Sequence, residues 1–138
     1  MKDGIEVFPH HAGLSVPDLN ASIKWYQDML GFTLEKSMEM PPLHAKIAFI
    51  KTGDFRIELF QVEGAKTLPD DRRYPQKDIA THGWKHLSLG VKDVKKTLEI
   101  LKKKGVDIAM EGEVNGEAMA FLRDNSGNLV EINKIGFV

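Results

Sequence analysis

One stretch of the sequence occurs twice. The run from His11 to Leu19 returns from His86 to Val94, with His, Leu, Val, Asp and a final apolar residue in the same places. Each copy alternates apolar residues with small or polar ones and then passes through an Asp into an amphipathic segment. This pattern is typical of a strand, a helix N-cap and a helix. We therefore expect the chain to contain two copies of one structural unit.

Both halves continue with three further strands, which predicts two β-α-β-β-β modules and an α+β fold. In the first half we expect strands over 7–16, 32–39, 45–52 and 55–62, with a helix from Asp18 to Gly31. In the second half we expect strands over 84–91, 106–111, 117–123 and 129–134, with a helix from Asp93 to Gly105. Module 1 then covers about 7–62 and module 2 about 84–134, within a single domain over 1–138. The Gly-, Pro- and charge-rich segment 63–83 is the predicted linker.

Charge and composition narrow the class of partner. The 138 residues have a formal net charge of −1 with both signs interspersed, which argues against binding to nucleic acid or to a membrane surface. No apolar segment approaches the length of a membrane span, so we expect a cytoplasmic protein that binds a small molecule. Because the chain has no cysteine, any metal must be held by imidazole and carboxylate.

The repeat extends to four side chains that suit a metal. Glu58 and Glu131 each stand between two apolar residues in the last strand of their half, so alternation turns both carboxylates away from the packed layer. His11 and His86 likewise lie opposite the apolar residues of their strands, beside small neighbours that leave a cavity. If the first and last strands of each half are adjacent, His11 meets Glu58 and His86 meets Glu131.

Two imidazoles and two carboxylates facing one cavity suit a divalent first-row metal and leave positions for water or substrate. Taken singly, each of the four is also compatible with a hydrogen-bonded or solvated strand residue. Their recurrence at matching positions favours a metal site.

The remaining histidines carry less signal: we expect His10 on the packed face or at a strand edge, His44 in a surface loop and His82 in the linker.

As a set, these motifs resemble the vicinal oxygen chelate superfamily, also called the glyoxalase and bleomycin-resistance fold. The resemblance covers the chain from Val7 to Asn133. It rests on both His repeats and on Trp25-Tyr26, Leu30-Gly31-Phe32, Ile57-Glu58-Leu59, Ala120-Phe121 and the segment from Asp124 to Glu131. The resemblance implies paired modules whose sheets curl into an open barrel around a metal.

Within the superfamily, the order His11, Glu58, His86, Glu131 is similar to the ligand order of bacterial glyoxalase I. That similarity implies one divalent ion (Zn, Ni, Co, Mn or Fe) and an isomerase or lyase that abstracts a proton next to a carbonyl through a metal-bound enediolate. It gives the catalytic base role to Glu131, with Glu58 as the second candidate, and it implies a homodimer. It leaves open whether one chain or two chains complete the site.

The substrate stays open, because the positions that anchor glutathione in glyoxalase I hold Ser15, Val62 and Glu117 here. Three alternatives remain. The runs Ala45–Phe49 and Gly53–Glu58 are similar to methylmalonyl-CoA epimerase, which runs the same chemistry on a thioester. A metal-free antibiotic-binding protein is the non-enzyme alternative. An Fe(II) extradiol dioxygenase is the last, although it needs two His and only one carboxylate.

Overall fold

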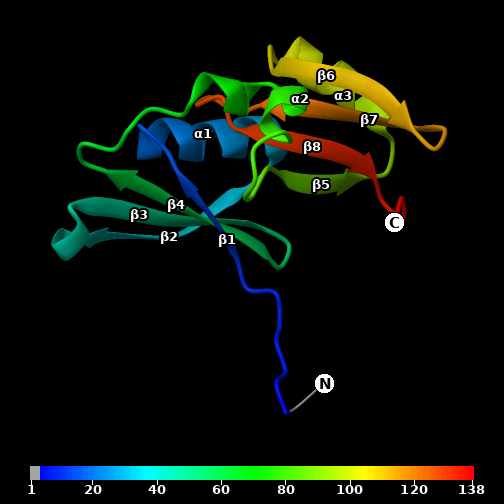
Figure 1. The fold of residues 1–138 in the computed structure, drawn as a ribbon. Coiled ribbons are helices and arrows are strands. Elements are labelled where there is room, and N and C mark those ends of the chain that lie inside the picture. Colours follow the sequence, from blue (N-terminus) through cyan, green and yellow to red (C-terminus); the bar gives the residue numbers. More distant parts are fainter. Residues whose placement is uncertain (1–3) are drawn as a thin grey trace. The chain divides into compact units, whose positions relative to one another are not determined.

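The computed structural model describes residues 4–138 and divides the chain into two units, Met1–Ala65 and Lys66–Val138. Each unit holds one four-stranded mixed sheet and one long helix (Figure 1). The predicted α+β class, with two β-α-β-β-β modules, is confirmed. Among residues 4–138, no helix is both long enough and apolar enough to span a membrane.

Unit 1 contains β1 (Ala12–Ser15), α1 (Leu19–Leu30), β2 (Thr33–Met40), the 3₁₀ turn η1 (Pro41–Leu43), β3 (Ala45–Thr52) and β4 (Phe55–Val62). The strand order is β1-β4-β3-β2. β1 pairs with β4 in parallel, whereas the β3 pairings with β2 and β4 are antiparallel. The first strand of the unit therefore lies directly beside the last one, as the metal-site prediction requires.

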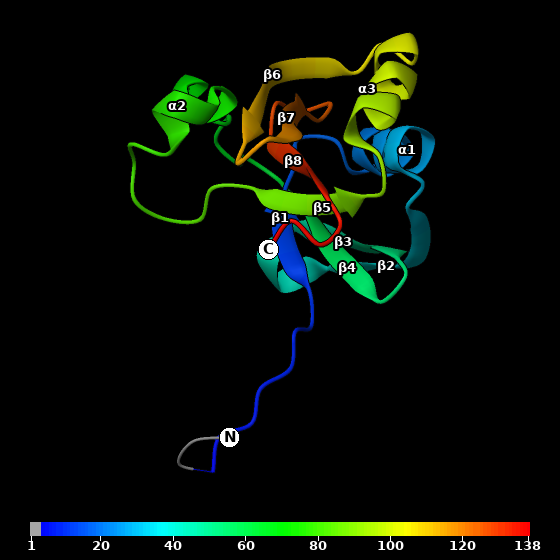
Figure 2. The ribbon, with the colours of Figure 1, turned by 90° about the vertical axis from the view of Figure 1, so that its right-hand side faces the viewer.

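Unit 2 begins with the short helices η2 (Asp70–Arg73) and α2 (Pro75–Asp78), followed by β5 (Leu87–Val91), α3 (Val94–Lys103), β6 (Asp107–Val114), β7 (Glu117–Arg123) and β8 (Leu129–Lys134). Its strand order is β5-β8-β7-β6, with β5 parallel to β8 (Figure 2). The topology repeats that of unit 1 strand for strand. The sequence repeat is thus a repeat of structure.

The same capping residue starts both long helices. The Asp18 carboxylate accepts a hydrogen bond from the Ala21 backbone N–H, and the Asp93 carboxylate accepts one from Lys96, each at 3.0 Å. A capping carboxylate satisfies a backbone donor that has no partner inside the helix, which typically stabilises the protein by about 1 kcal/mol. Gly31, at φ 75°, ends α1 in the left-handed conformation that glycine adopts without strain.

One face of each sheet forms the core. Ile57 and Leu59 of β4 are fully buried, as are Val130 and Ile132 of β8. α1 contacts β2, β3 and β4, and α3 contacts β7 and β8. Burying each such aliphatic side chain contributes roughly 1.5–3 kcal/mol. Because side chains alternate along a strand, this burial turns the Glu between each apolar pair to the opposite, open face.

Several segments differ from their predicted form. The strand predicted over 84–91 begins only at Leu87, and the strand predicted over 106–111 runs on to Val114. The strand predicted over 7–16 is confined to Ala12–Ser15, because pairing with β4 begins only at Ala12. The predicted linker over 63–83 contains η2 and α2, with Pro75 at the first helical position of α2 and Asp78 buried in its last. Pro pre-sets the helical φ at that position, which helps a short helix form in a segment with little apolar character.

Candidate metal centre

The first pair of predicted ligands comes together in unit 1. Parallel pairing sets Gly13 of β1 opposite Glu58 of β4, which places His11 and Glu58 on the same open face. The His11 Nε2 atom lies 3.3 Å from Glu58 Oε1, and the two side chains are 31% and 19% exposed. The pair is therefore half-buried and can still be reached by a small ligand.

Unit 2 reproduces this pair. Ser88 of β5 lies opposite Glu131 of β8, and His86 Nε2 lies 3.7 Å from Glu131 Oε1. The side chains of His86 and Glu131 are 24% and 20% exposed, close to the values in unit 1. The structure thus brings the four predicted ligands together two by two, one pair in each unit.

A phenylalanine lies against each histidine. The rings of His11 and Phe49 are nearly perpendicular, with centroids 5.5 Å apart. His86 and Phe121 meet in the same way at 4.8 Å. Phe49 pairs with Glu58 across β3 and β4, and Phe121 pairs with Glu131 across β7 and β8. An edge-to-face contact restricts the imidazole orientation.

These two phenylalanines were not among the predicted site residues. The signal that could have found them is their place in the repeat. Ala48-Phe49 and Ala120-Phe121 occupy matching positions in the third strand of each half, with an apolar residue after each pair. Because paired strands place such positions beside the Glu of the last strand, the repeat alone could have predicted that a phenylalanine lies next to each glutamate.

Asn133 supports the carboxylate of unit 2. Its side-chain amide donates to Glu131 Oε1 at 2.6 Å and to Ser88 Oγ at 2.8 Å. The equivalent positions in unit 1 hold Phe60 and Gly13, and the Phe60 ring would lie 3.4 Å from a Cβ on Gly13. Polar support in unit 2 is thus replaced by close aromatic packing in unit 1. Sequence reasoning did not identify Asn133.

The other ring nitrogen of His11 also has a partner. His10 Nδ1 and His11 Nδ1 are 2.7 Å apart, so one ring donates and the other accepts. This contact leaves His11 Nε2 directed at Glu58. His10 was predicted on the packed face or at a strand edge. It is exposed, so the first of these two placements is wrong. His44 lies after η1 at φ 49° and His82 lies in the loop before β5; both are exposed.

An ionic cluster lies on the same face of unit 1. Arg56, two residues before Glu58, donates to both oxygens of Glu35 at 2.8 and 2.9 Å, and Lys51 Nζ lies 3.2 Å from the same carboxylate. Hydrogen bonds from Arg56 and then from Lys51 lower the pKa of Glu35 from 4.5 to about 2. The Glu35 carboxylate in turn raises the pKa of Arg56. Glu35 therefore stays ionised over the whole physiological pH range.

Within each unit, the separation of the two donor atoms suits adjacent positions on one ion. Two donors about 2.1 Å from a metal are about 3.0 Å apart at octahedral angles and about 3.4 Å apart at tetrahedral angles. The observed 3.3 Å and 3.7 Å are close to this range. Among residues 4–138, no three His, Asp or Glu side chains of the structure form a metal-binding group. Each described unit therefore brings together one imidazole and one carboxylate.

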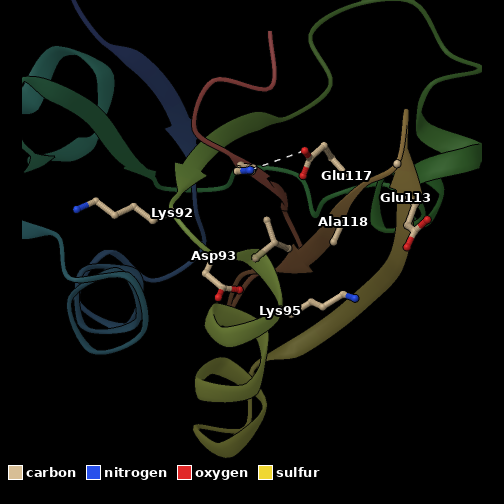
Figure 3. A pocket seen from close by; sticks show the side chains of 9 residues that line it. Lys92, Asp93, Lys95, Glu113, Glu117 and Ala118 are labelled. Atoms are coloured by element: carbon tan, nitrogen blue, oxygen red, sulfur yellow. Dashed lines mark ion pairs between the residues drawn. The ribbon is translucent and has the colours of Figure 1, made fainter.

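A cavity of about 330 Å³ lies elsewhere in unit 2, between the start of α3 and the hairpin that joins β6 to β7 (Figure 3). Its six charged lining residues are three lysines and three acids: Lys92, Lys95, Lys134, Asp93, Glu113 and Glu117. The Lys134 ammonium lies 3.8 Å from the Glu117 carboxylate. Because the charges balance and neither His86 nor Glu131 lines this cavity, it does not belong to the candidate centre.

Comparison with known proteins identifies the family. Residues 9–132 match the family model described as the Glyoxalase/Bleomycin resistance protein/Dioxygenase superfamily. A lactoylglutathione lyase of Haemophilus influenzae is 32% identical over 130 residues, covering 88% of this chain and 87% of the relative. The mitochondrial methylmalonyl-CoA epimerase of Mus musculus is 26% identical over 130 residues, covering 91% of this chain and 71% of the relative.

A solved structure shows the same fold. A trypanothione-dependent glyoxalase I of Leishmania major superposes with a TM-score of 0.73 at 25% sequence identity. The match covers 94% of this chain and 87% of that one. The likeness therefore extends over both units and their connecting segment.

Proposed function

Because the chain belongs to the glyoxalase/bleomycin resistance protein/dioxygenase superfamily, we propose that it is a metal-dependent isomerase or lyase of the lactoylglutathione lyase type. The observation that carries the proposal is the repeated pair of a histidine and a glutamate on the open face of each sheet. The reaction is abstraction of a proton from a carbon next to a carbonyl, followed by its return to the product.

His11, Glu58, His86 and Glu131 would hold one divalent ion such as Zn, Ni, Co, Mn or Fe. The donor set of two imidazoles and two carboxylates suits all of these ions. When bound, the ion polarises the substrate carbonyl and stabilises the negative charge that develops on its oxygen, which lowers the barrier by several kcal/mol.

Glu131 is the proposed base. It accepts the proton from the substrate carbon and returns it to the product carbon, so one carboxylate acts first as the general base and then as the general acid. Asn133 holds one oxygen of Glu131 through a hydrogen bond at 2.6 Å, which fixes the orientation of the carboxylate. Glu58 remains the second candidate, because its pairing with His11 is nearly the same as that of Glu131 with His86.

The proposed substrate carries a proton on a carbon next to a carbonyl, as do the hemithioacetal of an α-ketoaldehyde and an acyl thioester. Ser15, Val62 and Glu117 stand where glyoxalase I anchors glutathione, and none of them supplies the expected contacts. Epimerisation of an acyl-CoA is the second candidate, favoured by the likeness to methylmalonyl-CoA epimerase over 91% of this chain.

Each described unit supplies only two ligands, so completing the set requires two units. We expect a homodimer in which modules of two chains share a site. A unit that presents only two ligands on an open face favours such an assembly. Light scattering at micromolar concentration measures this directly. A metal-binding monomer would show that the two units of one chain complete the site instead.

Metal analysis tests the proposal. Wild-type protein loaded with Zn²⁺ or Co²⁺ should retain one ion per site after gel filtration, and His86→Ala should lose it, because the loss of an imidazole donor sharply weakens affinity. His82→Ala is the matched control and should keep its metal. Full occupancy in His86→Ala contradicts the proposed ligand set. Absence of metal from the wild type favours the antibiotic-binding alternative, and oxygen consumption during turnover favours the dioxygenase alternative.

A further inference from the structure

Asp78, at the end of α2, is a buried charge outside the candidate metal centre. Its side chain is 1% exposed, and Oδ2 is buried without a hydrogen-bond partner among the described residues. Oδ1 receives both Arg72 Nε at 3.1 Å and Lys85 Nζ at 3.2 Å. A buried carboxylate is costly unless it is paired, so the two cations and Asp78 depend on one another.

The same two cations hold the backbone of the returning loop. Lys85 Nζ donates to the carbonyl oxygens of Asp78, at 2.8 Å, and of Thr81. Arg72 Nη2 donates to the carbonyl oxygen of Trp84 at 3.0 Å. The segment from 72 to 85 is therefore closed into a loop around the Asp78 carboxylate. Its contacts fix the backbone at residues 84 and 85, which lead into β5.

The loop ends at His86. Lys85 is the residue immediately before this proposed ligand, and its side chain is only 19% exposed. His86 itself lies one position before Leu87, where pairing with β8 begins. The sheet consequently fixes the backbone on one side of His86, and the ionic loop is what fixes it on the other.

We propose that Asp78 is a positioning residue for the metal centre: through Lys85 and Arg72 it holds the backbone that presents His86 beside Glu131. The part of this inference that concerns metal affinity rests on the proposed function. The part that concerns the order of the loop does not. Neighbours that orient a metal ligand typically change metal affinity by about 10–100-fold when they are removed.

Two substitutions distinguish positioning from simple electrostatics. Asp78→Asn removes a negative charge from the loop that leads to His86, whereas Lys85→Met removes a positive one while keeping most of the apolar stem. Electrostatics alone predicts weaker cation binding in the first variant and tighter binding in the second. Positioning predicts weaker Zn²⁺ binding in both, by about tenfold or more. Asp71→Asn is the matched control, because Asp71 lies in η2 next to Arg72 but is 71% exposed.

The experiment combines Zn²⁺ affinity, measured by chelator competition, with hydrogen exchange of the peptide covering 79–88. We expect exchange in that peptide to be at least about tenfold faster in Asp78→Asn and Lys85→Met, with the amides of β1 and β4 unchanged. Unchanged exchange in 79–88, or affinity changes of opposite sign, overturns the inference. If Asp78→Asn does not fold, Lys85→Met decides the outcome. A wild type that binds none of Zn²⁺, Ni²⁺, Co²⁺, Mn²⁺ and Fe²⁺ refutes the proposed function, while the exchange measurement still tests the loop.

Discussion

The two units place the same three side chains on their open faces and surround them differently. In unit 1, His11 lies between Glu58 and the ring of Phe49; in unit 2, His86 lies between Glu131 and the ring of Phe121. The residues just outside these triads are not repeated. The comparison separates what the repeat preserves from what each unit adds.

The position before each histidine shows the difference most clearly. In unit 1 it is His10, an exposed ring that meets His11 Nδ1. In unit 2 it is Lys85, whose ammonium is tied to the buried Asp78. One histidine is thus oriented through its ring by a neighbour at the surface, and the other through its backbone by a loop that closes around the buried Asp78 carboxylate.

The residues at the bulges in β2 and β6 also differ between the two units. Register shifts occur between Leu34 and Lys36 in unit 1 and between Ile108 and Met110 in unit 2, at matching places in the repeat. The bulge of unit 1 carries Glu35, which binds Arg56. The bulge of unit 2 carries Ala109 and Met110, which pack against an apolar cluster. The bulge of unit 1 therefore places charge beside the His11–Glu58 pair, whereas the bulge of unit 2 packs into a buried apolar cluster.

These differences imply that the two carboxylates have different roles, although their pairings with histidine are alike. Glu131 has a hydrogen-bond donor, Asn133, at the position where Glu58 has Phe60. A carboxylate that must take a proton from one carbon and give it to another benefits from a fixed orientation. The asymmetry supports Glu131 as the base and Glu58 as a ligand alone.

The largest expected effect separates these two roles. Glu131→Gln should lower kcat by about 10²–10⁴-fold, because the amide still offers an oxygen to a metal but accepts no proton at neutral pH. Glu58→Gln should lower kcat much less, at equal metal occupancy. Turnover in deuterated water is the measurement, and wild-type protein should place solvent deuterium at the product carbon. Equal losses in the two variants would mean that the half-sites share the proton transfer.

A smaller effect is expected from the support of Glu131. Asn133→Leu removes its hydrogen-bond donor, and hydrogen bonds to charged groups contribute about 1.5–3 kcal/mol, so kcat should fall by roughly 10- to 150-fold. KM and metal occupancy should change little. Ser88→Gly, which installs the residue found at the equivalent position of unit 1, should cost less because it removes only the second partner of Asn133. A larger loss in Ser88→Gly would argue against Asn133 as the orienting residue.

Much of this architecture could be predicted from the sequence, because the pattern is local. Ala45–Thr52, Phe55–Val62, Glu117–Arg123 and Leu129–Lys134 begin and end where predicted. Each is an apolar-rich run bounded by turn-forming residues, and the alternation around Glu58 and Glu131 indicates which face is buried, so strand identity and length are both encoded nearby. The pairing of His11 with Glu58 and of His86 with Glu131 followed from the same alternation and from the repeat.

The rest depends on contacts between distant residues. The pairing of β1 with β4 begins only at Ala12, so the residues from Val7 to His11 lie outside the sheet although the sequence predicts a strand there. Asp78 resembles any other acid in a charged loop until Arg72 and Lys85 surround it. Asn133 is one polar residue at the end of a strand, and its role depends on Ser88 and Glu131. No local pattern distinguishes such residues.

The smallest expected effect concerns the ionic cluster that only unit 1 carries. Because the pKa of Glu35 is lowered from 4.5 to about 2, its ionised form stabilises the folded state above pH 4.5, and this contribution is lost as the pH falls toward 2. Glu35→Gln should therefore lower Tm slightly at pH 7 and not at all near pH 2. The effect is small because partly exposed ion pairs are screened by solvent. Thermal unfolding of both proteins between pH 7 and pH 2 is the measurement, with Glu39→Gln, an exposed residue of the same strand, as control. A Tm difference that persists at pH 2 would assign the role of Glu35 to packing in the bulge instead of to its charge.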